Sequence, residues 1–160
     1  MRAYSLSHLT DPELLRGLAS LVAQDRATTA TLLAHIAEFD ARRLYLPAAY
    51  PSTFAYCVHE LRLSEDAAYK RIQAARVARQ FPVIFEALAD GRLHLSAVGL
   101  LAPYLTSENA DDLLAAATHR TKAEITPPTM LPTLPVRVPR AGVDLVDHPN
   151  LMLGDLDPLD

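Results

Sequence analysis

Apolar residues recur three and four positions apart from Thr10 to Thr126, and no alternating strand pattern persists, so the sequence predicts helices joined by short turns. The first helix begins at Thr10-Asp11-Pro12-Glu13, a capping box with an early proline. Two apolar faces follow, formed by Leu14, Leu15, Leu18, Leu21 and Val22 and then by Leu32, Leu33, Ile36 and Phe39. Residues 11–43 therefore form either one long helix or two helices joined near 17–20.

Further helices are expected to begin directly after Ser or Thr N-caps or after a proline. Their predicted ranges are 53–61 after Ser52, 65–80 after Ser64, 83–89 after Pro82, 96–102 after Ser96 and 107–119 after Thr106. The helix 53–61 is expected to bury Phe54, Val58 and Leu61. A last capping box, at Thr121 and Glu124, is stopped by the prolines that follow Thr126.

Residues 127–160 contain seven of the chain's twelve prolines, which favours an extended or disordered tail. The predicted fold is therefore an all-α, multi-helix orthogonal bundle over residues 1–126, followed by this Pro-rich, acidic tail. At 160 residues with 50% apolar side chains, the chain suffices for one domain with a core.

The net charge of -4 is unevenly distributed and does not by itself indicate a nucleic-acid binder. Residues 126–160 carry two Arg and five Asp, which leaves 13 Lys+Arg and 14 Asp+Glu, out of totals of 15 and 19, for residues 1–125. The acidity is therefore concentrated in the tail, and the helical part is nearly neutral.

Several classes of protein and site are excluded by what the sequence lacks. It has no apolar run long enough to cross a membrane and no signal peptide, so we expect a cytoplasmic protein with no membrane partner. Cys57 is the only cysteine and is expected to be a buried small hydrophobe. No two histidines lie three or four positions apart, and no glycine-rich phosphate loop or nucleophile elbow is present. The sequence therefore predicts no catalytic residue, metal, cofactor or small-molecule substrate. Asp144, Asp147, His148 and Asn150 are interpreted as part of a solvated linker.

The helices 53–61 and 65–80, joined by a three-residue turn, have the arrangement of a helix-turn-helix. Four basic residues of the second helix are candidates for phosphate contacts, and two further side chains for contacts with bases or sugars. The basic residues are Lys70, Arg71, Arg76 and Arg79, and the other two are Tyr69 and Gln73. Alternatively, these charges serve solubility, because they scatter around the helix and Asp66 and Lys70 form an ordinary i,i+4 pair.

The same helix is rich in alanine, which predicts close packing against two neighbouring helices. Ala67, Ala74 and Ala78 line one of its sides, and Ala68, Ile72 and Ala75 line another. This pattern indicates a central structural role for the helix.

Three stretches closely resemble the N-terminal helical domain of bacterial HNH endonuclease-like proteins. They are the YP-S-FAYC pattern at Tyr50 to Cys57, LSEDAAYKRIQAAR at Leu63 to Arg76, and P…AL..GRLHLS from Pro82 to Ser96, within a resemblance that spans residues 6–125. In that family a metal-dependent nuclease domain follows the helical region. Here Thr126-Pro127-Pro128 replaces the continuing helix and no HNH-like pattern follows, so the resemblance implies a DNA-related setting but carries over no catalytic residue.

These observations leave three hypotheses about function. The first is a non-catalytic DNA-binding or DNA-positioning module that uses the 65–80 helix. The second is an interaction module in which the 11–43 helix and the alanine-rich faces bind another protein or a second copy of the chain. The third is nuclease activity through an unrecognised site. A truncated, non-functional remnant of an HNH endonuclease is a further alternative.

Overall fold

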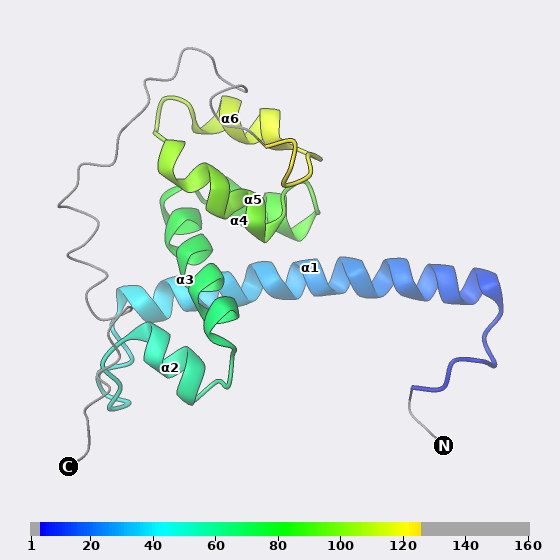
Figure 1. Cartoon of the computed structure of the whole chain (residues 1–160), viewed down its shortest axis with the longest axis horizontal. Helices are drawn as coiled ribbons and strands as arrows, with labels where there is room; N and C mark the ends of the chain where they lie inside the picture. Colours follow the sequence, from blue (N-terminus) through cyan, green and yellow to red (C-terminus); the bar gives the residue numbers. More distant parts are fainter. Residues whose placement is uncertain (1–3, 126–160) are drawn as a thin grey trace.

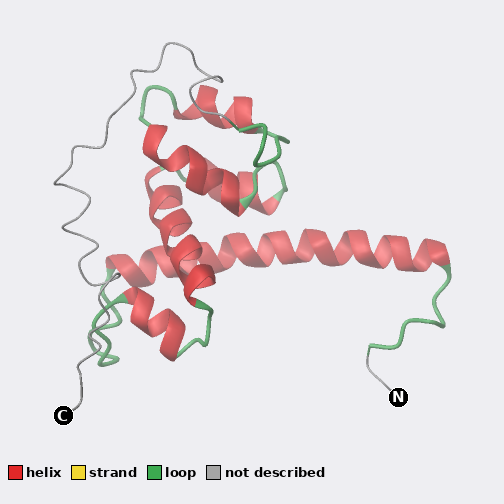
Figure 2. Cartoon of the chain, in the orientation of Figure 1, coloured by secondary structure: helices red, strands yellow, loops and turns green. Residues whose placement is uncertain are grey.

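The computed structural model describes residues 4–125, and all regular structure in that range is helical (Figures 1 and 2). The all-α prediction is therefore confirmed. The elements in chain order are α1 (Asp11–Ala41), α2 (Thr53–His59), α3 (Glu65–Gln80), α4 (Val83–Ala89), α5 (Leu95–Leu101), the 3-10 turn η1 (Ala102–Tyr104) and α6 (Ala110–Ala117). The predicted tail, 127–160, with its Asp144 to Asn150 segment, lies outside the described residues.

The first predicted segment is one continuous helix, α1, which resolves the choice between one helix and two. Its 31 residues give it a length of about 46 Å. The predicted capping box is formed, because Glu13 Oε2 accepts hydrogen bonds from the Thr10 N–H at 2.9 Å and from the Thr10 hydroxyl at 2.7 Å. The helix thus begins where the sequence predicts and is not broken at Gly17.

The caps of α2 and α3 also follow the prediction, whereas the end of α2 does not. Ser52 Oγ accepts from the Ala55 N–H and Ser64 Oγ from the Ala67 N–H. However, α2 ends at His59, and Leu61 is 45% exposed instead of buried. Arg62 has a left-handed backbone (φ 59°), and the Leu63 N–H donates to the Cys57 carbonyl at 3.0 Å, so the chain turns back directly after Leu61.

The hydrophobic core lies between the C-terminal half of α1 and the shorter helices. In Figure 1, α3 crosses this half of α1, with α2 on one side and α4, α5 and α6 on the other. Helix α1 packs on α3 and α4, and α3 also packs on α2 and α5. The largest fully buried side chains are Leu33, Ile84, Leu101, Leu113, Val98 and Cys57. The burial expected for Cys57 is confirmed.

Alanines allow α3 to pack closely against its neighbours, which are the four helices α1, α2, α4 and α5 and not the two that were predicted. Ala68, Ala74, Ala75 and Ala78 are all buried along it, together with Ile72. Helix α3 is therefore the central structural element of the body.

The last two helices begin at other residues than predicted. Helix α5 begins at Leu95, with His94 and not Ser96 at its N-cap. Helix α6 begins only at Ala110, because the Asn109 side chain holds the preceding residues in a turn. Its amide oxygen accepts from the Thr106 N–H at 2.8 Å, and its amide nitrogen donates to the Tyr104 carbonyl at 2.9 Å. Further on, Glu124 accepts from both the N–H and the hydroxyl of Thr121, whereas the Glu124 N–H donates to the Thr121 carbonyl, so only the Glu124 half of the last predicted capping box is formed.

The N-terminal half of α1 projects beyond the body (Figure 1). The turn between α4 and α5 touches α1 at Arg26, whose guanidinium lies over Gly91, where a Cβ would be only 2.6 Å from Nη1. The first buried residue along α1 is Ala30. We call residues 11–25 the arm, because they precede this contact and are all exposed.

Candidate functional site

The six predicted DNA-contact residues all lie on α3, at its exposed or partly exposed positions. Tyr69, Lys70, Arg76 and Arg79 are exposed, and Arg71 and Gln73 are partly buried. Successive residues turn by 100° around a helix, so Tyr69, Gln73 and Arg76 lie on one stripe, while Lys70, Arg71 and Arg79 point elsewhere. The structure therefore places three of the six side by side.

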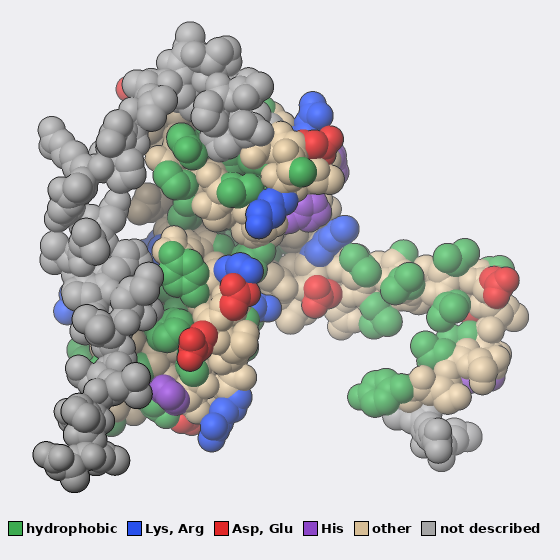
Figure 3. Space-filling view, in the orientation of Figure 1, with side chains coloured by type: hydrophobic (Ala, Val, Ile, Leu, Met, Phe, Trp, Pro, Cys, Tyr) green, Lys and Arg blue, Asp and Glu red, His purple; other side chains and the backbone are tan. Residues whose placement is uncertain are grey.

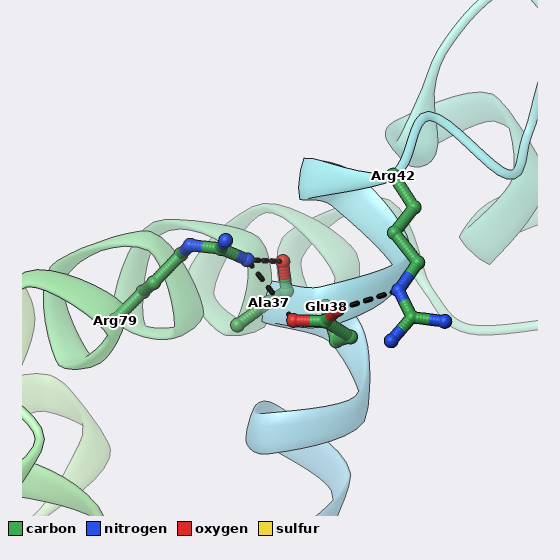
Figure 4. A network of polar contacts seen from close by, with 4 residues as sticks. All are labelled: Ala37, Glu38, Arg42 and Arg79. Carbon is green, nitrogen blue, oxygen red and sulfur yellow. Dashed lines mark hydrogen bonds and ion pairs between the residues drawn. The ribbon is translucent and has the colours of Figure 1, made fainter.

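Arg76 and Arg79 hold α3 against α1. The Arg76 guanidinium binds the Asp40 carboxylate through two hydrogen bonds, Nε to Oδ2 at 2.8 Å and Nη2 to Oδ1 at 3.1 Å. Arg79 Nη1 donates to the Ala37 carbonyl at 3.1 Å and lies 3.3 Å from Glu38 Oε2, and Glu38 is also paired with Arg42 (Figure 4). Bidentate arginine–carboxylate pairs are among the stronger ionic contacts. Both arginines therefore have an internal structural role.

The other candidate residues make contacts within α3 itself. Lys70 Nζ lies 2.8 Å from Asp66 Oδ2, which is the i,i+4 pair predicted in the alternative interpretation. Gln73 Nε2 donates to the Tyr69 hydroxyl at 3.1 Å, and Arg71 Nη1 reaches the Ala67 carbonyl at 3.4 Å. These contacts are weak enough for an incoming ligand to replace.

The carboxylates of Glu38 and Asp40 on α1 offset the positive charges of Arg76 and Arg79 on α3. Arg42 and Arg79 hold the pKa of the Glu38 carboxyl below its usual value, the hydrogen bond from Arg42 having the largest effect. At Asp40, burial raises the pKa, but hydrogen bonds from Arg76 and Thr53 and the positive charges nearby outweigh it and lower the pKa below 3.8. Both carboxylates are therefore ionised at neutral pH and compete with any phosphate for the two arginines.

Asp40 and Thr53 are structurally important residues that the sequence analysis did not single out. Thr53 is buried at the start of α2, and its hydroxyl donates to Asp40 Oδ1 at 2.6 Å. A signal for Asp40 was available, because it lies three and four positions after Ala37 and Ile36 and so continues the buried face of α1. An acid on such a face is expected to have a partner.

The second candidate surface is the apolar stripe of the arm. It consists of Leu14, Leu15, Leu18, Leu21 and Val22, which fall within an arc of roughly 120° around α1. These side chains are 40% to 67% exposed, and in the sequence analysis they form an apolar face of the helix that the second hypothesis assigns to a protein partner. Figure 3 shows apolar side chains along this projecting part of the helix. The stripe lies outside the packed body.

The described residues offer little for chemistry. Among residues 4–125, no three His, Cys, Asp or Glu side chains are grouped so as to hold a metal ion. Burial raises the pKa of the Cys57 thiol, and the Asp40 charge adds to this effect, so the thiolate is disfavoured. In the same range, no helix has the length and hydropathy needed to cross a bilayer.

Comparison with known proteins adds no assignment, because no family model, curated protein or solved structure matches this chain. The resemblance to HNH endonuclease-like proteins therefore stays a prediction from sequence motifs.

Proposed function

We propose that this chain is a non-catalytic protein-interaction module whose α1 arm docks a helix. The observation that carries the proposal is the row of five large apolar side chains that the body leaves uncovered. Single exposed apolar residues are ordinary, whereas a contiguous apolar face on a projecting element is typical of a binding surface. A helix laid along the stripe would meet these side chains at the i, i+3, i+4 and i+7 spacing that helix pairs use.

The rest of the fold supports this proposal by anchoring the arm. Leu33 and Ile36 on the second half of α1 are buried against the body, and Arg76 and Arg79 attach the same half to α3. Because α1 is one helix, these contacts fix the direction in which the arm projects. The body thus acts as a support for an interaction element.

The proposal is tested by placing one negative charge on either face of the arm. We expect Leu18→Glu to abolish binding of helical peptides selected from a displayed library against the wild-type chain. The reason is that Leu18 lies at the centre of the stripe, where a buried unpaired carboxylate is costly. Ser20→Glu is the matched control, because Ser20 lies on the opposite side of the same helix and its substitution should leave binding within about twofold.

Circular dichroism should show that both variants keep the wild-type helix content, because positions 18 and 20 are exposed. The displayed library contains helical sequences of every kind, so the selection does not presuppose the partner. Failure to enrich any peptide, together with a monomeric mass at all concentrations, would count against the proposal. Equal loss of binding in both variants would show that another surface is used.

A second candidate function is DNA positioning, which the exposed Tyr69 and Lys70 on α3 favour, together with the motif resemblance. For this function we expect duplex binding that falls with salt and weakens further in a Tyr69→Ala/Lys70→Ala variant. This pair leaves the Arg76 and Arg79 contacts with α1 intact, so the fold is preserved. Fluorescence anisotropy of a labelled duplex at two salt concentrations measures the effect, and Lys122→Ala outside α3 is the control. No binding at low salt would eliminate this candidate.

A further inference from the structure

The apolar stripe of the arm has a carboxylate at each end. Asp11 precedes Leu14 and Asp25 follows Val22, and the two acids are fourteen positions apart. Fourteen residues make nearly four full turns, so Asp11 and Asp25 lie on the same face as Leu18, about 21 Å from each other. The stripe is therefore an apolar patch with a negative charge at both ends.

Neither carboxylate is used within the folded body. In the part of the chain that the structure describes, Asp11 and Asp25 take part in no hydrogen bond or ion pair, whereas Glu38, Asp40, Asp66 and Asp90 are all paired with basic side chains. Both are available to a ligand on the stripe, where opposite charges at the rim of an interface add specificity.

A second copy of the chain does not complement this charge pattern. An antiparallel pairing centred on Leu18 places Asp11 of one copy opposite Asp25 of the other, and a parallel pairing places each acid opposite itself. Shifting the antiparallel register by seven residues puts an acid opposite Leu18. Each of these pairings either places like charges opposite each other or buries a carboxylate. Helix pairs discriminate against a partner through such contacts.

The chain's own C-terminal segment does not complement Asp11 and Asp25 either. Residues 126–160 contain two Arg and five Asp, so this segment is itself acidic. A membrane surface also fits poorly, because helices that lie on anionic lipid carry Lys and Arg beside the apolar stripe and not acids. The charges therefore favour another protein with a basic element.

We infer that the arm docks an amphipathic helix of a different protein, with an apolar stripe of about three turns and Lys or Arg at both ends of that stripe. This inference depends on the proposed function of the arm and specifies the chemistry of the partner. The apolar contacts supply the affinity, while the two ion pairs at Asp11 and Asp25 determine which helix is accepted and in which register.

The test compares two synthetic amphipathic peptides with the same leucine stripe, one with Lys at both ends of the stripe and one with Glu. We expect the full chain to bind the Lys peptide roughly threefold to thirtyfold more tightly, as two rim ion pairs warrant. In an Asp11→Asn/Asp25→Asn variant this preference should disappear. In the control Asp111→Asn/Asp112→Asn, which removes the same charge from α6, it should remain.

The possible outcomes separate this inference from the proposed function. Equal affinities of the two peptides for the wild-type chain would overturn the inference while the docking function stands. A dimer that is lost in Leu18→Glu would also overturn it, because the partner would be a second copy. Binding to anionic vesicles and to neither peptide would identify a lipid surface instead. A monomer that binds no peptide and no vesicle would remove both proposals.

Discussion

Leu33→Ala is expected to lower the free energy of unfolding by about 2–5 kcal/mol, whereas Leu15→Ala, in the same helix, should change it by no more than about 0.5 kcal/mol. The two leucines belong to the two ends of α1 and differ only in what surrounds them. Leu33 is fully buried against the body, and Leu15 is 67% exposed on the arm. Truncating Leu33 removes apolar contacts and leaves a cavity, while truncating Leu15 removes atoms that already face water.

Chemical denaturation of the wild-type chain and the two variants, monitored by circular dichroism, measures this difference in the free energy of unfolding. Both substitutions replace leucine with alanine inside one helix, so the difference in helix propensity cancels. A comparable loss of stability at both positions would mean that Leu15 is covered in solution. That result would contradict the arm as a free surface and would also remove the basis of the docking proposal.

The second large effect is expected at Asp40, the carboxylate shared by three helices. Asp40→Asn should destabilise the fold by about 1–3 kcal/mol at neutral pH, because the Arg76 guanidinium and the Thr53 hydroxyl lose a charged acceptor. The matched control is Asp66→Asn, which removes an exposed i,i+4 pair with Lys70 and should cost at most about 0.5 kcal/mol.

The effect of Asp40→Asn should also depend on pH. Because the pKa of Asp40 is lower in the folded chain than its ordinary value of 3.8, its ionised form stabilises the fold at all pH values above about 4. This contribution is lost as the pH falls through the folded pKa. Urea denaturation from neutral pH to about pH 2 should therefore show the wild-type and Asp40→Asn curves converging below about pH 4. A difference that stays constant over this range would show that the Asp40 charge is not the source of the stability.

The sequence was sufficient to predict most of the helices because the required signals are local. The Thr10 capping box, the Ser64 cap, and Pro82 before α4 with Gly91 after it each act within a few residues. The wrong helix ends depend on individual backbone and side-chain features: Arg62 adopts a left-handed backbone after α2, and the Asn109 side chain ties the turn before α6 to the Tyr104 carbonyl. Periodicity thus predicts where a helix forms, while the residues at which the helix begins and ends also depend on such individual contacts.

The candidate site was predictable only in part. The basic residues of α3 were identified, but their partners Asp40 and Glu38 lie 36 and 41 positions away, respectively, from Arg76 and Arg79, and no local pattern reveals such pairs. Periodicity likewise showed that both halves of α1 have an apolar face. It did not show which half is covered, because that depends on how far α3 and α4 reach along α1.

The projecting position of the arm also affects how firmly it holds its own shape. A helix of about 15 residues without tertiary support is only marginally stable in water, and Gly17 within it weakens it further, by about 1 kcal/mol relative to alanine. We therefore expect the free end of the arm to unwind and re-form more often than the anchored half of α1, from which the arm continues as one helix. A partner that docks on it must also hold it helical, so folding of the arm and recognition of the partner are one coupled equilibrium, which the helix propensity of residue 17 also shifts.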